Sequence, residues 1–386
     1  MMSEQAMRGG VGGVDLSIFL SEERQHAPSV RQVAGEAGWA AVTDFCYLSN
    51  KFFPTPEILE LLKEQLPYII KAYPSMQSHQ VKLVSQLSGV DEKRLAVGNG
   101  GSELILILGR GLGKRYLMPA PSYMEYENVF LDFGKEVLYF PLEEDREFYI
   151  NVPRLIRTAK EADADGLLIV NPNTPTGQKT NLDDLLMILD ALKHLEVIIV
   201  DESFIEFSNI DRANVPSVLP YLERYTNLVV VKSLGKDYGA PGLRSGFAAS
   251  GNPQRVAFMR KQLPIWNISP LTECYFELLV KYRDDYERAR VRCIRATQEL
   301  SHDLARIDGI KVFPTYADFV LFKLTNHLTS TFLRDELLIR HGLYVRDCRG
   351  KVGLTDEFIR VGTHTEENNA RLIEAIREIL SHRVRR

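Results

Sequence analysis

Short apolar runs alternate with amphipathic stretches through the middle of the 386-residue chain. The runs are continuous rather than alternating apolar and polar, which is typical of strands buried on both faces of a parallel sheet. Helical patterns separate them, so the order predicts an α/β sheet with helices on both faces. The predicted strands lie within residues 94–100, 114–121, 136–142, 166–173, 197–203 and 227–233.

The helical stretches carry start signals and also mark a change of pattern. One helix is predicted from Thr180, which has an aspartate three residues later at capping-box spacing, and another from Ser102. From about Pro270 a single long helix is predicted, and short strands follow it, which favours a smaller α+β domain. The predicted divisions are an N-terminal arm with part of the small domain (1–45), a large α/β domain (46–285) and a small C-terminal domain (286–386).

Composition narrows the range of partners. The formal net charge of -4 and the 25% of charged residues favour neither nucleic acid nor an anionic membrane as a partner. No apolar run is long enough to span a bilayer, and the first residues lack the apolar core of a secretory signal. Two glycine pairs in that segment predict a flexible arm.

The cysteines and histidines are scattered. Cys46, Cys274, Cys293 and Cys348 form no CxxC pair, so we expect reduced thiols and a cytoplasmic protein rather than a disulfide framework. The eight histidines form no cluster with ligand spacing, so we expect no metal.

Chemically useful side chains follow the predicted strands where these end, which is where ligands bind in open α/β sheets. Asp201 follows an apolar run directly, and a carboxylate there keeps a ring nitrogen protonated, as pyridoxal phosphate requires. Lys236 follows the next strand and can form a Schiff base if it is partly desolvated. The competing interpretations are a helix cap for Asp201 and a solvated loop position for Lys236.

Two groups of residues suit a phosphate. Gly100, Gly101 and Ser102 stand where a helix begins, so backbone N–H groups and the helix dipole favour an anion there. Arg244, between Gly242 and a further glycine, can clamp a phosphate. The dinucleotide GxGxxG spacing and the P-loop pattern are both absent. Each feature is weak alone, but their order along the chain indicates a pyridoxal phosphate site.

Three stretches carry a resemblance to a known family: SLGKDYGAPGLRSGF, NPNTPTG and VDESFIEF. From about Tyr47 to about Ile379 the sequence resembles the class I/II aminotransferases, fold type I of the pyridoxal phosphate enzymes. The resemblance implies a mostly parallel seven-stranded sheet in a large cofactor-binding domain, and a smaller C-terminal domain. It also implies that Lys236 carries the cofactor, that Asp201 pairs with the pyridine nitrogen, and that Ser233 and Arg244 hold the phosphate.

Within the family, the sequence is most similar to the histidinol-phosphate aminotransferase and threonine-phosphate decarboxylase branch. In AYPSMQ, the resemblance implies that Tyr73 reaches the cofactor phosphate of a partner subunit, hence a homodimer with shared active sites. In APSYMEYE, FIRVGTHTEEN and LYVRDC it implies that Tyr123 stacks on the cofactor ring, Arg360 binds the substrate α-carboxylate and Arg346 binds a distal phosphate.

Residues 261–286, together with residues 236–251, also resemble the transaminase-like half of phosphonate enzymes that carry a nucleotidyltransferase. A chain of this length is not expected to hold that second domain.

Two positions depart from the family pattern. The asparagine that contacts the phenolic oxygen of the cofactor normally precedes P-T-G, whereas here Thr174 has that place and Asn173 stands one residue earlier, so either residue can serve. Phe204 stands where aminotransferases usually have a tyrosine that also contacts this oxygen. Threonine-phosphate decarboxylases often carry phenylalanine there, so Phe204 favours decarboxylation or another non-standard reaction.

Three functions follow as hypotheses. The first is an aminotransferase acting on a phosphorylated, phosphonate or otherwise acidic or polar amino acid. The second is a decarboxylase or lyase of a phospho-amino acid. The third is a binding module that keeps the fold without catalysis, although the first 45 residues are too few for the DNA-binding domain that regulators with this fold carry.

Overall fold

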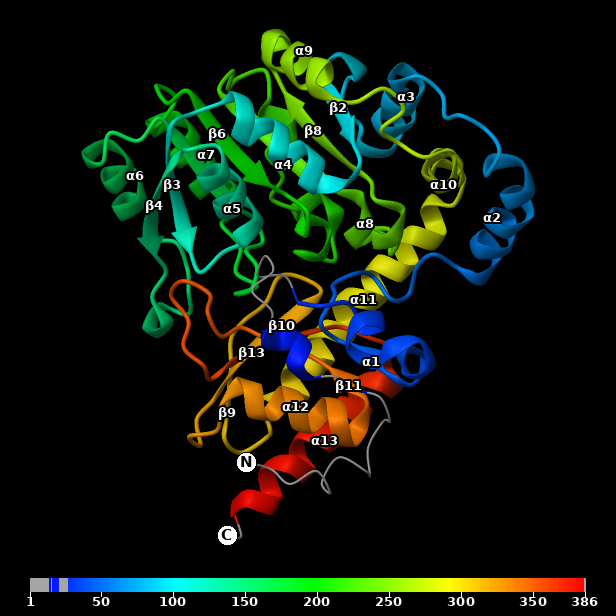
Figure 1. The fold of residues 1–386 in the computed structure, drawn as a ribbon. Helices are drawn as coiled ribbons and strands as arrows, with labels where there is room; N and C mark the ends of the chain where they lie inside the picture. Colours follow the sequence, from blue (N-terminus) through cyan, green and yellow to red (C-terminus); the bar gives the residue numbers. More distant parts are fainter. Residues whose placement is uncertain (1–13, 15, 21–26, 385–386) are drawn as a thin grey trace.

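The computed structural model describes residues 14, 16–20 and 27–384, so residues 1–13, with the glycine pairs of the predicted arm, lie outside the described part. Figure 1 shows a large sheet with helices around it and, below it, a smaller group of strands and helices. The arrowheads of β3 and β4 are directed toward that smaller part. The carboxyl ends of the parallel strands therefore face the junction between the two parts.

Within the described residues, seven strands form the large sheet in the spatial order β2-β8-β7-β6-β5-β3-β4. Neighbouring pairs from β4 to β7 are parallel, whereas β8 is antiparallel to both β7 and β2. All six strands predicted from the apolar runs are present. The strands are β2 (Leu95–Gly98), β3 (Arg115–Ala120), β4 (Glu136–Pro141), β5 (Gly166–Val170), β6 (Val197–Asp201), β7 (Leu228–Ser233) and β8 (Gly246–Ser250).

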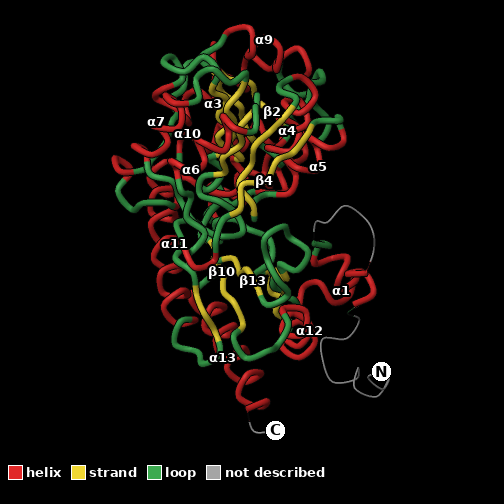
Figure 2. The backbone as a smooth tube through the Cα atoms, turned by 90° about the vertical axis from the view of Figure 1, so that its left-hand side faces the viewer, coloured by secondary structure: helices red, strands yellow, loops and turns green. Residues whose placement is uncertain are grey.

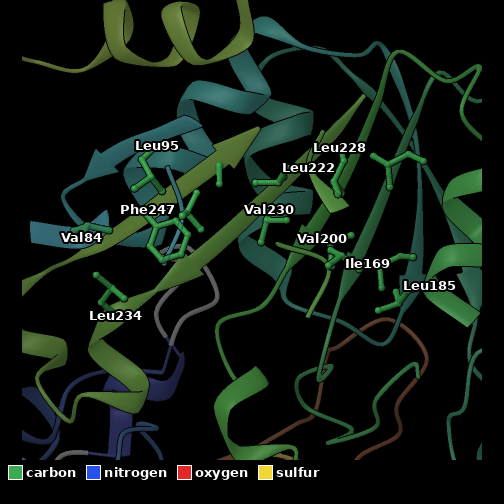
Figure 3. Close-up of a cluster of buried hydrophobic side chains, with 14 of the residues drawn as sticks. Val84, Leu95, Ile169, Leu185, Val200, Leu222, Leu228, Val230, Leu234 and Phe247 are labelled. Atoms are coloured by element: carbon green, nitrogen blue, oxygen red, sulfur yellow. The ribbon is translucent and has the colours of Figure 1, made fainter. Parts of the chain in front are cut away.

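Alternate residues of the central strands face opposite sides of the sheet. In β6, Ile198 and Val200 belong to one buried cluster, whereas Val197 and Ile199 belong to another. Figure 3 shows Val200 close to Val230 of β7 in the first cluster. Burial on both faces is the reason for the continuous apolar runs. The covering helices are α2 (Pro56–Ile69), α3 (Gln77–Ser88), α4 (Gly100–Gly111), α5 (Met124–Asp132), α6 (Val152–Glu161), α7 (Leu182–Ala191), α9 (Pro253–Gln262) and α10 (Pro270–Lys281).

The smaller part is built on an antiparallel sheet in the order β12-β13-β10-β9. Helix α11 connects it to the large part, as Figures 1 and 2 show. Tyr286 at its start packs in the core of the large sheet, while Leu300 and Leu304 pack in the core of the small one. Its elements are α11 (Arg283–Leu304), β9 (Ile310–Val312), β10 (Phe319–Leu324), α12 (Ser330–His341), β12 (Arg346–Asp347), β13 (Phe358–Gly362) and α13 (Glu366–Val384).

The described N-terminal residues pack against the smaller part. Strand β1 (Thr43–Asp44) pairs in parallel with β11 (Leu343–Tyr344), and α1 (Val30–Gly38) precedes it. The hydroxyl of Tyr344 donates to the carbonyl of Pro28 over 2.9 Å. The described N-terminal residues therefore pack together with the smaller part as one unit.

Four details differ from the predicted pattern. The helix predicted from Thr180 has Asn181 as its N-cap and no side-chain cap bond, because the backbone N–H and C=O of Thr180 bond the side chain of Asn171. The helix predicted from Ser102 begins two residues earlier, at Gly100. The single long helix is two helices, separated at Tyr282. Strand β8 was not predicted from an apolar run.

None of the helices in the described part of the chain combines the length and apolarity that crossing a membrane requires.

Candidate active site

A cavity of ≈ 820 Å³ lies beyond the carboxyl ends of β5, β6 and β7. Its walls come from the large part, from the small part and from the N-terminal residues, Ser29 and Arg31 among them. Every residue that the sequence predicts at the site lines this cavity, except Gly100, Asn173 and Tyr73. Side chains that are far apart in the sequence therefore converge on one volume.

Lys236 lies on α8 (Leu234–Asp237), a four-residue helix that follows β7 directly. Gly239 fixes the path of the chain behind it, because its φ is +62° and a Cβ there would stand 1.7 Å from the carbonyl oxygen of Phe53. Burial lowers the pKa of Lys236 to about 8, since desolvation disfavours the ammonium form; the carboxylate of Asp318 opposes this change. The neutral, nucleophilic fraction of this amine near neutral pH is therefore larger than that of an ordinary lysine.

Asp201 is the last residue of β6 and is 4% exposed. One carboxylate oxygen, Oδ2, accepts a hydrogen bond from the hydroxyl of Tyr126 over 2.8 Å, and Oδ1 accepts one from the backbone N–H of Ser203 over 2.9 Å. Burial raises the pKa of Asp201, and hydrogen bonds from Ser203 and Tyr126 and the charge of Lys236 oppose that rise. A buried carboxylate in this position suits a cationic partner.

Tyr126 was not assigned a role from the sequence. It lies on α5, three residues after Tyr123, and the two rings meet edge to face at 6.2 Å. The helical spacing within APSYMEYE places both aromatic rings on one side of α5. That spacing is the signal by which Tyr126 was recognisable.

An anion cradle lies at the N-terminus of α4. The guanidinium of Arg244 donates to Ser102 Oγ over 2.9 Å and to the carbonyl of Pro241 over 3.3 Å. Gly100 does not line the cavity, but a Cβ on it would lie 2.5 Å from Nη2 of Arg244, so its role is to leave room for the guanidinium. Backbone N–H groups, a guanidinium and the nearby hydroxyl of Ser233 together suit a phosphate.

Arg360 lies on β13 and enters the cavity from the small part. Its Nη1 donates to Thr174 Oγ1 over 3.0 Å and its Nη2 donates to the carbonyl of Cys46 over 2.6 Å. Its Nε is buried and has no hydrogen-bond partner in the described part of the chain. The guanidinium carbon lies 5.4 Å from the ring centre of Phe319. Arg360 therefore keeps hydrogen-bonding capacity for an anion.

Asn173 and Thr174 differ in orientation. The amide of Asn173 accepts from Ser122 Oγ over 2.7 Å and donates to the carbonyl of Pro121 and to Thr176 Oγ1. Thr174 lines the cavity, whereas Asn173 holds the loop together beneath it. Of the two alternatives left open by the sequence, Thr174 is the residue that faces the cavity.

Phe204 and Tyr73 occupy very different environments. Phe204 is 5% exposed, lines the cavity and meets Phe319 edge to face at 5.3 Å. Tyr73 is 78% exposed, lies outside the cavity and packs on Trp266 with ring centres 4.5 Å apart. Within one chain, Tyr73 does not join the site.

The sequence analysis missed five charged residues near the site: Asp318 and Lys351, and also Arg31, Asp44 and Glu125 of the cavity wall. Both carboxylate oxygens of Asp318 are buried without a hydrogen-bond partner in the described structure, and burial raises the pKa of Asp318 to about 6 against the influence of Lys236. Lys351 lines the cavity beside Arg346. Asp318 stands just before a predicted strand, which is a faint signal, whereas Lys351 stands in a glycine-flanked loop with no signal.

These residues fit pyridoxal phosphate. Lys236 would supply the amine, Asp201 would pair with the ring nitrogen, Tyr123 would supply an aromatic face, and Ser102 and Arg244 would form a phosphate cradle that depends on the absence of a Cβ at Gly100. Among the described residues, no group of three His, Cys, Asp or Glu side chains is arranged to bind a metal ion.

Comparisons with known proteins agree with this arrangement. The family model for aminotransferase class I and II matches residues 41–376. The chain is 31% identical over 365 residues to the L-serine phosphate decarboxylase of Campylobacter jejuni, covering 92% of this chain and 93% of that protein. It is 30% identical over 340 residues to the CMP-5'-(3-aminopropyl)phosphonate synthase of Streptomyces rubellomurinus, covering 88% of this chain and 53% of that protein.

The crystal structure of the histidinol-phosphate aminotransferase from Clostridium acetobutylicum superimposes with a TM-score of 0.80 at 25% identity, covering 88% of this chain and 100% of that one. The predicted fold class is therefore confirmed, as is the resemblance to these branches. Since the family model spans most of the chain and the site offers a buried amine, a buried carboxylate and a cluster of residues that suits an anion, this chain belongs to the class I and II aminotransferases, which work with pyridoxal 5'-phosphate.

Proposed function

We propose that the protein decarboxylates a small O-phosphorylated amino acid, for which O-phospho-L-serine is the first candidate. The observation that carries the proposal is the charge of the cavity combined with Phe204. Basic side chains outnumber acidic ones by six to three, which suits a substrate with a carboxylate and a phosphate. Phe204 offers no hydroxyl to the cofactor, unlike the tyrosine usual in aminotransferases, and the Campylobacter jejuni relative is named for decarboxylation. The basic residues are Arg31, Lys236, Arg244, Arg346, Lys351 and Arg360, and the acidic ones are Asp44, Glu125 and Asp201.

Each residue of the site has a distinct role in the proposed reaction. Bound pyridoxal phosphate supplies an electron sink for the electron pair left when a bond to the substrate Cα breaks. Asp201 would hold a proton on the ring nitrogen through its charge, and Tyr126 fixes the orientation of that carboxylate. Ser102, Ser233 and Arg244 would bind the cofactor phosphate. Tyr123 would pack against the ring.

Substrate orientation selects the bond that breaks, because only the bond perpendicular to the cofactor ring is activated. Arg360 binds the α-carboxylate in the hypothesis drawn from the sequence, while Arg346 binds the distal phosphate. If Arg346 bound the carboxylate and Arg360 bound the phosphate instead, the substrate would be turned in the site. A different bond to Cα would then stand perpendicular to the ring. Lys236, with its pKa of about 8, accepts and returns protons near neutral pH.

Product analysis tests the proposal. The purified enzyme is incubated with O-phospho-L-serine, with and without 2-oxoglutarate as an amino acceptor. We expect one carbon dioxide for each phosphoethanolamine, with the carboxylate replaced by a proton, and no glutamate. Glutamate formed without carbon dioxide would overturn the proposal. A Lys236→Ala variant should lose about 10²- to 10⁴-fold or more in rate, the range typical of removing a general acid or base.

Transamination of a phosphorylated or phosphonate amino acid is the second candidate. It is favoured by the similarity to a histidinol-phosphate aminotransferase, together with the placement of Lys236 as a base with a lowered pKa. The glutamate measurement above separates the two reactions.

We further propose a homodimer with shared active sites, located in the cytoplasm. Large apolar side chains are exposed around the end of α2 and the loop before α10, including Ile70 (77%), Tyr73 (78%) and Ile265 (68%). Apolar surface of this kind is typical of a protein interface. Tyr73 lies within that surface, which is where a residue offered to a partner subunit belongs. The free thiols of the four cysteines suit a reducing compartment.

A further inference from the structure

Lys351 reaches the cavity on the loop between β12 and β13. Figure 1 shows this orange-red loop extending from the smaller part to the ends of β3 and β4. Gly350 and Gly353 allow its path, with φ of +82° and +85°. A Cβ on Gly353 would stand 3.0 Å from the ring of Pro121, so the loop packs closely on the exit of β3. The loop therefore fixes Lys351 against the large part.

Lys351 lines the cavity, and its ammonium has no hydrogen bond or ion pair with any described residue. A desolvated cation without a partner is costly, and a bound anion removes that cost. Lys351 shares this end of the cavity with Arg346 and Arg360. A carboxylate carries one negative charge, and a phosphate dianion carries two. The count of three matches a substrate that carries both groups.

We propose that Lys351 binds the distal dianion of the substrate, a phosphate or phosphonate, and takes up a proton when that dianion binds. The inference deepens the proposed function and rests on it for the identity of the substrate.

The surroundings of Lys351 explain the proton uptake. Burial lowers the pKa of its ammonium to about 7, with Arg346 of β12 as the next largest cause, and Arg360 of β13 acts in the same direction. The thiol of Cys348 and the carboxylate of Glu127 on α5 oppose them. Near pH 8 most of the ligand-free protein therefore holds Lys351 neutral. A dianion stabilises the ammonium, so binding draws a proton from solvent.

The test uses the holoenzyme and 3-phosphoglycerate, which has the carboxylate and phosphate of phosphoserine but a hydroxyl in place of the amine. Calorimetric titration at pH 8 in two buffers of different ionisation enthalpy counts the protons taken up. We expect uptake approaching one proton per site, and an affinity that falls by up to about tenfold per pH unit between pH 7 and 9. The phosphate itself is already dianionic there, with a second pKa near 6.

Variants separate Lys351 from other causes. Lys351→Arg should still bind 3-phosphoglycerate but abolish the proton uptake, and its affinity should no longer fall between pH 7 and 9, because a guanidinium stays charged. Lys351→Met should weaken 3-phosphoglycerate binding by about 10- to 100-fold, as expected for a lost hydrogen bond to a charged group, and leave glycerate binding unchanged. Lys93→Met, on the exposed helix η4 (Glu92–Arg94), should change neither.

Each result supports or overturns the inference. Proton uptake that persists in Lys351→Arg, an unchanged affinity in Lys351→Met, or failure of the wild type to bind 3-phosphoglycerate would overturn it. Lys351-dependent binding without turnover of phosphoserine would overturn the proposed function and leave the role of Lys351 standing. Turnover of phosphoserine that is unaffected in Lys351→Met would support the proposed function and overturn the role of Lys351.

Discussion

At the scale of single residues, the nearby charge of Asp318 influences the titration of the Lys236 amine. Asp318 is 1% exposed, and neither of its carboxylate oxygens has a hydrogen-bond partner in the described structure. It is the leading charge that counteracts the effect of burial on Lys236. A buried carboxylate with no hydrogen bond is costly, and the nearby cationic charges of Lys236 and Arg360 make it tolerable.

Replacing that carboxylate should change the titration of the amine. In Asp318→Asn a negative charge that favours the ammonium is lost, so the pKa of Lys236 should fall below its present value of about 8. In the cofactor-free protein, the rate at which an amine-reactive reagent labels Lys236, followed by mass spectrometry of its peptide, should then rise at lower pH than in wild type. An Asp183→Asn control on α7 should leave the profile in place. A profile unchanged in Asp318→Asn would show that Asp318 does not act on the amine.

At the scale of elements, the start of α4 forms the phosphate cradle only because Gly100 lacks a side chain. Its φ of +80° and the 2.5 Å approach to Arg244 both exclude an ordinary residue. By contrast, a Cβ on Gly242, beside the same arginine, meets nothing within 4 Å. The two glycines therefore form a matched pair for experiment.

Gly100→Ala should displace the guanidinium of Arg244 and weaken cofactor binding. The affinity for the cofactor should fall about tenfold or more, which is the contribution of one charge-assisted hydrogen bond. The strained backbone should also lower the stability of the protein. Gly242→Ala should bind the cofactor as wild type does. Equilibrium dialysis of pyridoxal phosphate, together with thermal unfolding of the cofactor-free proteins, separates the two effects. Equal cofactor affinities in both variants would show that the phosphate cradle does not require glycine at position 100.

The elements predicted correctly are those whose own residue types indicate that they are buried. The β-branched run of β6 is buried on both faces, and its sequence alone indicates this. Strand β8 (GFAAS) is equally buried but, apart from Phe247, is built from small residues, and α4 packs closely against it. The helix start at Asn181 depended on a distant partner, Asn171, that engages Thr180. No local pattern records such a partner.

At the scale of the whole molecule, the site is assembled from segments that only the fold brings together. Lys236, Asp201 and Arg244 were predicted because each stands in a local motif at a strand end. Asp318 and Lys351 acquire their roles from neighbours in other segments, so the sequence around them carries little information. The division of the chain at residues 45 and 285 remains a prediction.

Shared sites predict that two inactive chains can restore one another. When Lys236→Ala and Tyr73→Ala chains are mixed and allowed to exchange, a hybrid dimer holds one site with both native residues. Random exchange should give roughly a quarter of wild-type activity, since half of the dimers are hybrids with one intact site.

The control mixes Lys236→Ala with Asp201→Asn. Both residues belong to the same chain's site, so every site in those hybrids keeps a defect and no activity should return. If the first mixture also stays inactive although subunit exchange is observed, Tyr73 does not complete a partner's site.

The parallel pairing of β1 with β11 has a consequence for the order in which the protein is made. On the ribosome, Thr43 and Asp44 emerge well before Leu343–Tyr344, the strand that holds them, has been synthesised. The pairing that anchors this wall of the cavity therefore cannot form until β11 has emerged. A nascent chain assembles its sheet first and closes its binding chamber last, so premature termination before β11 leaves that chamber open.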